Sequence, residues 1–230
     1  MVPALEEILA ATKSMVFFGG AGVSTESGIP DFRSVDGLYH QKFKYPPETM
    51  LSHTFYETHT AEFFDFYRQK LIVHGAKPNA AHLRLAALER EGKCRAVVTQ
   101  NIDGLHQAAG SKTVYELHGS TLRNYCTRCG KFFPVQFIED AAGVGDGVPR
   151  CDECGGIVKP DVVLYEEGLD EETMENAVHA IRGADTLIVG GTSLAVFPAA
   201  GLLRYFRGEN LVVINKQPTP ADAMANLLIH

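Results

Sequence analysis

The sequence predicts an α/β fold with a mostly parallel sheet covered by helices on both faces. Short apolar runs alternate with segments of helical periodicity along most of the chain, which is the pattern of parallel strands joined by helices. Four apolar runs lead into small or polar residues, at Gly20, Asn101, Ser193 and Asn215. Ligands bind outside the carboxyl ends of parallel strands, so we expect the functional site at that edge.

The elements of the first half follow from the spacing of apolar side chains. Helical spacing occurs in residues 2–13, 63–71 and 82–88. The last of these segments is followed by Gly92, a common helix stop. Compact apolar runs typical of buried strands occupy residues 15–18, 95–99 and 114–117.

The second half contains an inserted module. Between Cys126 and Cys154 cysteine, glycine and charged residues dominate. The apolar run then resumes at 162–165, followed by a helix at 171–182 and strands at 186–189, 211–214 and 227–229. We therefore predict a larger domain of residues 1–33, 78–123 and 157–230. The smaller domain, made of a helical insert and a cysteine module, takes 34–77 and 124–156.

Composition and charge exclude several classes of protein. The 230 residues carry 21 Lys and Arg against 28 Asp and Glu, a net charge of −7. Nucleic-acid binding needs clustered cations, so we expect no nucleic-acid partner. The chain has no apolar run long enough to span a bilayer. Its N-terminus has no basic region before an apolar stretch. We expect no membrane association and a cytoplasmic protein.

Five cysteines are present, and four form two tight pairs. Cys126 and Cys129 precede Cys151 and Cys154 by a gap of 21 residues. Four thiolates in two such pairs match the tetrahedral shell of Zn²⁺ and close it, so we predict one structural zinc ion. The fifth, Cys94, adjoins an apolar run, which favours a buried structural thiol.

Two glycine-containing loops are candidate binding elements. Residues 20–24, Gly-Ala-Gly-Val-Ser, follow the first strand, and glycines there allow close approach to a phosphate, with exposed N–H groups as donors. Thr25 stands where a dinucleotide fingerprint carries its third glycine, so a plain tight turn is an open alternative. Residues 28–33 place Asp31, Phe32 and Arg33 in a loop rigidified by Pro30. There, a structural Asp–Arg pair is the alternative.

Polar residues also follow the second and third strands. Residues 99–103, Thr-Gln-Asn-Ile-Asp, carry amides that can hydrogen-bond sugar hydroxyls or a carboxamide, although Asp103 can also cap a helix. His118 ends the third strand, and an imidazole with a pKa near ~6.5 suits general-base work. We expect the remaining histidines on surfaces or in ordinary contacts: His40, His53, His59, His74, His82, His106, His179 and His230.

Taken in order, these motifs resemble the sirtuin (Sir2-like) family of NAD-dependent protein deacylases, in its bacterial type. The matching residues are 20–24, 28–33, 99–103, 117–119, the four cysteines, 191–193 and Asn215. The resemblance implies a Rossmann-like domain beside a smaller zinc-binding and helical domain. It also implies NAD as co-substrate. The chain departs from the family pattern at Gly19, where Thr is common, and at Glu166, where Gly is frequent.

The resemblance also implies roles for individual residues. His118 is the expected general base, with Asn101 as a second catalytic residue. Contacts to NAD are expected from Gly20, Ala21, Gly22, Thr25, Asp31, Phe32, Arg33, Gln100, Asn101, Asp103, His118, Gly191, Thr192, Ser193, Asn215 and Lys216. The backbone of an extended substrate is expected to pair with Val162, Val163, Leu164 and Tyr165. Phe32, His118 and Val163 would wall the lysine tunnel.

The implied activity is removal of acetyl groups from protein lysines. Acetyl passes to ADP-ribose, and nicotinamide and O-acetyl-ADP-ribose are released. Protein ADP-ribosyl transfer and non-enzymatic NAD sensing are the alternatives. Acetylated proteins or peptides are the expected partners of a monomer. Phe64 and Tyr67 occupy the positions where succinyl-preferring members of the family carry a Tyr-x-x-Arg pair, and a shift of one residue would instead bring Arg68 there. We expect acetyl or longer apolar acyl groups to be preferred over succinyl groups.

Overall fold

A six-stranded parallel sheet forms the larger part of the protein. The computed structural model describes residues 4–32, 37–41 and 43–230. The sheet has the order β3-β2-β1-β7-β8-β9, and every pair in it is parallel. Its strands are β1 (Met15–Gly19), β2 (Cys94–Thr99), β3 (Val114–Glu116), β7 (Thr186–Gly190), β8 (Asn210–Ile214) and β9 (Leu227–Ile229). The predicted α/β class is confirmed.

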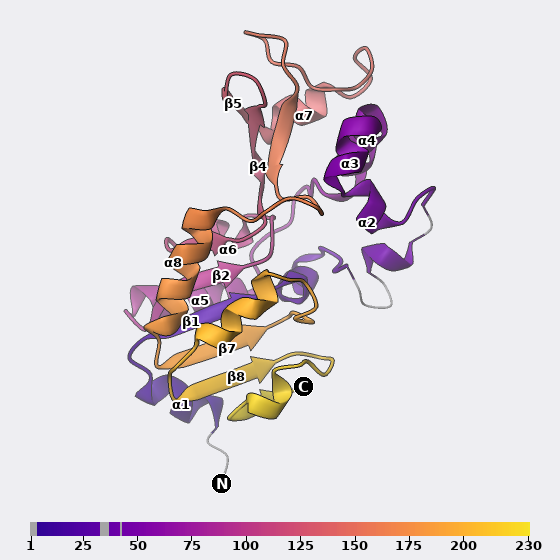
Figure 1. Cartoon of the computed structure of the whole chain (residues 1–230). Coiled ribbons are helices and arrows are strands. Elements are labelled where there is room, and N and C mark those ends of the chain that lie inside the picture. Colours follow the sequence, from indigo (N-terminus) through magenta and orange to yellow (C-terminus); the bar gives the residue numbers. More distant parts are fainter. Residues whose placement is uncertain (1–3, 33–36, 42) are drawn as a thin grey trace.

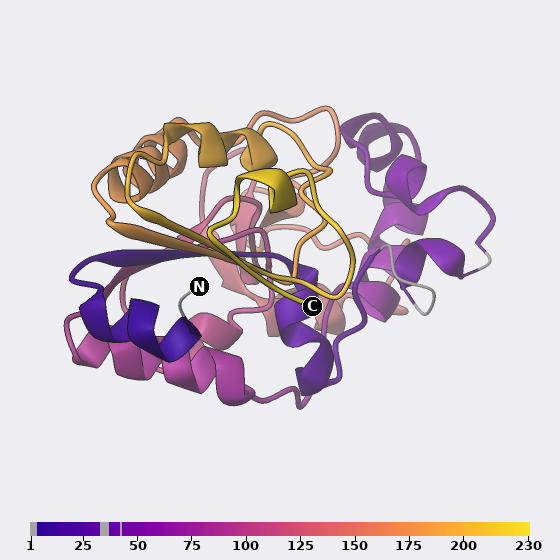
Figure 2. The same cartoon turned by 90° about the horizontal axis from the view of Figure 1, so that it is seen from below.

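Helices cover both faces of this sheet. Successive side chains of each strand point to opposite faces, so each face presents apolar residues to a helical layer. Met15 and Phe17 of β1 pack with α1 (Leu5–Ala11) and α5 (Ala80–Arg90). Val16 and Phe18 pack with α8 (Glu171–Arg182) and with η3 (Ala199–Tyr205). Figure 2 shows these two helical layers on opposite sides of the strands. The full burial of β1 explains why its sequence is an unbroken apolar run.

The strand order reverses between β1 and β7, where chain segments leave the sheet in opposite directions. Residues after β1, β2, β7 and β8 therefore meet at one edge, which is where open α/β sheets bind ligands. The loop after β1 continues into η1 (Ala21–Ser27), and α6 (Leu105–Ala108) follows β2. A last short turn, η4 (Asp222–Met224), precedes β9. No helix in the described parts of the chain is long and apolar enough to cross a membrane.

A second, antiparallel sheet of order β5-β4-β6 belongs to the smaller part of the molecule. It consists of β4 (Gly119–Cys126), β5 (Phe132–Pro134) and β6 (Val158–Val162), with α7 (Val135–Asp140) beside it. The insert after the first loop contains η2 (Leu38–His40), α2 (Pro47–Met50), α3 (His53–Thr58) and α4 (Thr60–Lys70). Phe63 and Phe64 of α4 share one core with Phe133 and Ile138. The helical insert and the cysteine module thus form one body (Figure 1).

The two sheets are joined where β3 passes into β4. Gly119, with φ +77°, makes the turn, and a Cβ there would lie 1.9 Å from the carbonyl oxygen of Asp161. Arg123 of β4 reaches both sheets, since it donates to Glu116 of β3 at 2.6 Å and to Asp161 of β6 at 2.8 Å. β4 crosses the predicted domain boundary at residue 123, and the boundaries themselves stay a prediction.

Candidate active site

The loop after β1 lies directly against the end of β7. The N–H groups of Gly20 and Gly22 donate to the carbonyl oxygens of Gly190 and Gly191, at 3.2 and 2.8 Å. A Cβ on Gly22 would lie 2.8 Å from the Cα of Gly191. Glycine is therefore needed at both 22 and 191, because a side chain at either residue would push the two backbones apart. These two N–H groups, which we expected among the donors for a phosphate, are instead used within the protein. A phosphate at this edge has to bind other groups of the loop.

A hydroxyl group organises the polar residues after β2. Ser24 donates to the Oδ2 atom of Asp103 at 2.6 Å and accepts from the Nδ2 atom of Asn101 at 3.1 Å. Asp103 also accepts from the N–H of Leu105, the first residue of α6, although the N-cap of that helix is Gly104 and not Asp103 as the structural alternative proposed. Gln100 donates to the hydroxyl of Thr192 at 3.0 Å, which links β2 to β7. Ser24 belongs to the glycine-containing motif at residues 20–24, but nothing in the sequence around it indicates this linking role.

His118 is half-buried and held in one orientation. Its Nδ1 atom lies 3.0 Å from the carbonyl oxygen of Gln100, and a carbonyl can only accept, so Nδ1 carries the proton. Nε2 therefore keeps a lone pair. Burial lowers the pKa of His118 below its usual value, which keeps the ring neutral at pH 7. The N–H of Gln100 donates to the carbonyl of Gly19, so one peptide group connects this ring to the glycine loop.

The predicted NAD loop is connected to the predicted substrate segment. The carbonyl groups of Asp31 and Phe32 accept from the N–H groups of Leu38 and Tyr39, at 2.8 and 2.9 Å. The rings of Phe32 and Tyr39 meet edge to face at 5.7 Å, and the hydroxyl of Tyr39 is hydrogen-bonded to that of Tyr165. Arg33 lies outside the described residues. Thr25 donates to the carbonyl of Gly22 within the loop.

The backbone of the predicted substrate segment already has partners. The N–H of Val163 donates to the carbonyl of His118 at 3.0 Å, and the N–H of Leu164 to the carboxylate of Glu167 at 2.8 Å. Tyr165 pairs through its N–H with Leu51 and through its carbonyl with His53. An extended substrate would therefore have to pair with backbone groups of this segment that are not used in these hydrogen bonds, or the hydrogen bonds would first have to break.

Glu166 is held in an unusual conformation for a residue other than glycine. Its φ of +77° lies in the left-handed region, which explains why glycine suits this position. The carboxylate accepts from the N–H and the hydroxyl of Thr54, at 2.9 and 2.7 Å. These bonds lower the pKa of Glu166. They also fasten the segment to α3 and offset the backbone strain.

The remaining predicted contacts to NAD follow β7 and β8. Thr192 is buried and Ser193 exposed, directly after β7. Asn215 follows β8, and its side chain donates to the carbonyl of Gln217 at 2.7 Å. Lys216 is exposed beside it. All four lie at the carboxyl end of the sheet, together with residues 20–22 and 100–103.

The four paired cysteines come together as a metal-binding group. Their sulfur atoms all lie within 4.8 Å of one another, and the Sγ atoms of Cys126 and Cys154 are 3.4 Å apart. Tetrahedral zinc with bonds of ~2.3 Å places sulfur atoms ~3.8 Å apart, so the group fits Zn²⁺. With four protein ligands the ion has a structural role. Cys94 is buried as predicted, and burial raises its pKa to about 12.

Two of the remaining histidines are more deeply buried than expected. The rings of His82 and His106 meet at 4.7 Å, and His82 lies 3.5 Å from the hydroxyl of Ser24. Neither ring nitrogen of His106 has a hydrogen-bond partner among the described residues. Burial lowers the pKa of His106 to about 3. His82 therefore contacts Ser24 of the site directly, and His106 packs against the ring of His82.

The residues considered for acyl preference are core residues. Phe64 and Tyr67 are fully buried in the smaller domain. The neighbouring Arg68 donates to the carbonyl of Gly147 at 2.8 Å and lies 3.4 Å from that of Ile138. Its guanidinium is therefore engaged with the backbone of the cysteine module.

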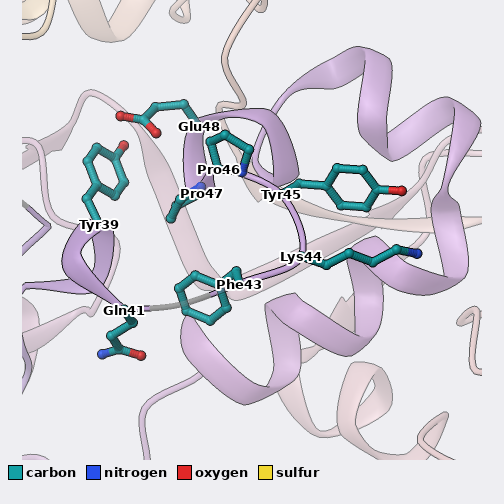
Figure 3. A pocket seen from close by; sticks show the side chains of 8 residues that line it. All are labelled: Tyr39, Gln41, Phe43, Lys44, Tyr45, Pro46, Pro47 and Glu48. Atoms are coloured by element: carbon teal, nitrogen blue, oxygen red, sulfur yellow. The ribbon is translucent and has the colours of Figure 1, made fainter.

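Two cavities lie in the helical insert, away from the sheet edge. One of about 530 Å³ lies beside η2 and α2 and is lined by Tyr39, Phe43, Glu48 and neighbouring residues. Figure 3 shows Lys44 and Tyr45 extending together from its rim. The other, of about 470 Å³, includes Tyr165 and Glu166. The polar residues of the sheet edge line neither cavity, so chemistry and not cavity size indicates the active site.

Comparison with known proteins identifies the family. A model of the Sir2 family matches residues 20–198. The chain belongs to the Sir2 family. It is 63% identical to the NAD-dependent protein deacetylase of Clostridium acetobutylicum, over 98% of this chain and 91% of the relative. The corresponding deacetylase of Clostridium perfringens is 59% identical, with 98% and 92% covered.

Solved structures agree with this assignment to the Sir2 family. A structure of Sir2 bound to acetylated peptide superimposes with a TM-score of 0.88 at 38% identity, covering 97% of this chain and 90% of the other. A structure of Sir2 with a p53 peptide and NAD⁺ gives 0.87 at 39% identity, with 97% and 90% covered. The predicted family is confirmed.

Proposed function

We propose that this Sir2-family protein is an NAD-dependent protein-lysine deacetylase in which His118 is the general base. The observation that carries this is the fixed imidazole: Nδ1 is committed to the carbonyl of Gln100, so Nε2 presents its lone pair. The same Gln100 peptide is bonded to Gly19, next to the glycine loop. A neutral base therefore stands at the sheet edge that binds ligands in such folds.

The polar residues after β2 are suited to hold a ribose and a carboxamide. When bound, NAD would supply a ribose carbon that the acetyl oxygen attacks as nicotinamide leaves. Asn101 is fixed by Ser24 and is buried, so its amide is preorganised for such a contact. His118 takes a proton from the ribose hydroxyl that then receives the acetyl group. With one water molecule consumed to release the lysine amine, the products would be free lysine, nicotinamide and O-acetyl-ADP-ribose.

The surroundings of the site favour a neutral acyl group. The N–H of Val163 is bonded to the carbonyl of His118, so the segment proposed for substrate lies beside the base. Phe32 is half-buried and contacts Tyr39, whose hydroxyl is bonded to that of Tyr165 in the same segment. Arg68 is bound to backbone carbonyls, leaving it unsuited to pair with a succinyl carboxylate. Acetyl peptides should turn over faster than succinyl peptides; faster desuccinylation would contradict this preference.

The proposed partners are acetylated proteins, acted on by a monomer in the cytoplasm without nucleic acid or membrane. Relatives named as deacetylases come from bacteria, and an acidic net charge of −7 suits basic protein partners better than nucleic acid. The relatives and structures described above support neither ADP-ribosyl transfer nor NAD sensing alone.

Replacement of the base tests this function. His118→Ala should lower kcat for an acetyl-peptide by about 10²- to 10⁴-fold, the usual contribution of general-base catalysis. The melting temperature should change little, because the ring donates only one hydrogen bond. His74→Ala, at an exposed position, is the matched control. A folded His118→Ala variant with the wild-type rate would show that the base is elsewhere.

A further inference from the structure

The second cavity of the helical insert borders the proposed substrate segment. It measures about 470 Å³ and lies between residues of α2 and α3 and residues 165–166. Pockets of about 300–1,000 Å³ accommodate small ligands or single side chains. Tyr165 and Glu166 continue directly from Val162–Leu164, so the cavity is a neighbour of the place proposed for the acyl-lysine. The inference below rests on that proposed function.

Aromatic rings form the inner wall of this cavity. Tyr45 and Phe55 meet edge to face at 5.4 Å, and Phe55 and His59 stack at 4.7 Å. Tyr165 lines the side nearest the substrate segment. The face of Phe55 is occupied by His59, but the faces of the tyrosine rings can attract cations. Tyr45 already binds a cation in this way at the rim of the cavity, where the ammonium group of Lys44 lies 5.1 Å from the centre of its ring.

Two carboxylates complete the cavity, those of Glu48 and Glu166. Both are exposed, and Glu166 is fixed by its bonds to Thr54 through a single oxygen, Oε2. Among the described residues that line the cavity there is no lysine or arginine, and His59 is the one side chain that can become positive. Lys44, at the rim, is paired with Glu62 at 3.1 Å. The lining is thus aromatic and acidic.

We propose that this cavity is a specificity subsite that binds a basic side chain, arginine or lysine, of the protein substrate near the acyl-lysine. Its chemistry combines ring faces with carboxylates, which together select a cation over a neutral side chain of the same shape. An extended peptide advances ~3.3 Å per residue. Because Tyr165 and Glu166 follow Val163 by two and three residues, we place the subsite opposite a substrate residue two or three positions from the acyl-lysine.

A peptide scan tests the subsite. Acetyl-lysine peptides carry arginine at one of the four positions on either side, and each is compared with its citrulline counterpart, which keeps the shape and removes the charge. At one position two or three residues away, arginine should raise kcat/KM about 5- to 10-fold, and the advantage should shrink at 500 mM salt. No preference at any position would overturn the proposal.

Variants locate the preference. Glu48→Gln and Glu166→Gln should each reduce the arginine advantage to about 2-fold or less, while Glu48→Gln leaves turnover of the citrulline peptide unchanged. Glu175→Gln makes the same charge change on α8 and should keep the full advantage. An advantage that survives both cavity variants would place the cation elsewhere and overturn the assignment.

A binding measurement separates this inference from the proposed activity. Fluorescence anisotropy of labelled arginine and citrulline peptides, without NAD, measures the subsite directly. Tighter binding of the arginine peptide, lost in Glu48→Gln, supports the subsite even if the wild-type protein turned over no acetyl-peptide. Equal affinity of the two peptides contradicts it, whatever the activity.

Discussion

At the scale of single residues, burial sets the chemistry of the histidines. His118 is half-buried with one nitrogen bonded to a carbonyl, whereas His106 is fully buried and its ring nitrogens have no hydrogen-bond partner among the described residues. In both cases burial disfavours the charged ring and lowers the pKa. The neutral ring of His118 can therefore accept a proton at pH 7. The neutral, buried ring of His106 lowers the free energy of unfolding only in acid.

The pH profile of turnover should reflect His118. The base must be neutral, and its pKa lies below the usual value of 6.5, so kcat/KM should stay high as pH falls to 6.5 and decline only below it. The measurement is kcat/KM for an acetyl-peptide between pH 5 and 8, with protein stability followed in parallel. An acid limb centred above pH 6.5 would contradict the assigned environment.

His106 should destabilise the protein in acid. Its pKa is about 3 in the fold and ~6.5 when unfolded, so the unfolded chain takes up a proton first as pH falls below 6.5. Between pH 7.5 and 5.5 this costs about 1.4 kcal/mol of unfolding free energy. His106→Phe should remove that loss and be near neutral at pH 7.5, because no hydrogen bond is broken.

Urea unfolding at the two pH values measures this effect. His74→Gln, at an exposed position, is the control and should keep the wild-type pH dependence. Equal pH dependence in His106→Phe and the wild type would mean that the buried ring is hydrated or charged.

At the scale of elements, the junction of the two sheets positions His118, the proposed base. His118 stands between β3 and β4, and the turn at Gly119 brings its Cα against β6. Arg123 closes this junction by binding a carboxylate from each sheet. Its partner Glu116 is 7% exposed, whereas the comparable pair of Arg84 and Glu91 is exposed on both sides.

Loss of Arg123 should therefore matter more than loss of an exposed arginine. Arg123→Met leaves the carboxylate of Glu116 without its partner at a nearly buried position, and we expect a loss of about 2 kcal/mol of unfolding free energy. Arg84→Met should cost less than about 0.5 kcal/mol. Chemical denaturation of both variants decides the matter, and similar losses would show that the junction is not held by this network.

At the scale of the whole molecule, the metal site and the helical insert stabilise one another. The cysteine module supplies Cys126 and Cys151 to the same core as Phe63 and Phe64 of α4. That core carries the segment beside the base. A structural metal contributes its binding free energy to the stability of such a domain.

Removal of zinc should therefore loosen the smaller domain. After chelation, verified by zinc determination, we expect the melting temperature to fall by at least about 5 °C, with early proteolysis between residues 126 and 154. Cys94→Ala, outside the metal group, should show the same response. A metal-free protein with an unchanged melting temperature would argue against a structural ion.

The sequence by itself determined the alternation of strands and helices, the four clustered cysteines and the histidine that we propose as the base. Each of these signals is local: an apolar run for a strand, two Cys-x-x-Cys pairs for zinc, a histidine at a strand end. Only the tertiary structure decided which hydrogen-bonding groups are already paired within the protein and which distant residues come into contact. The N–H groups of Gly20 and Gly22 pair with the last residue of β7 and the residue after it, Tyr39 bonds to Tyr165, and Glu166 bonds to Thr54. These contacts join residues far apart in the chain, and local periodicity carries no information about such partners.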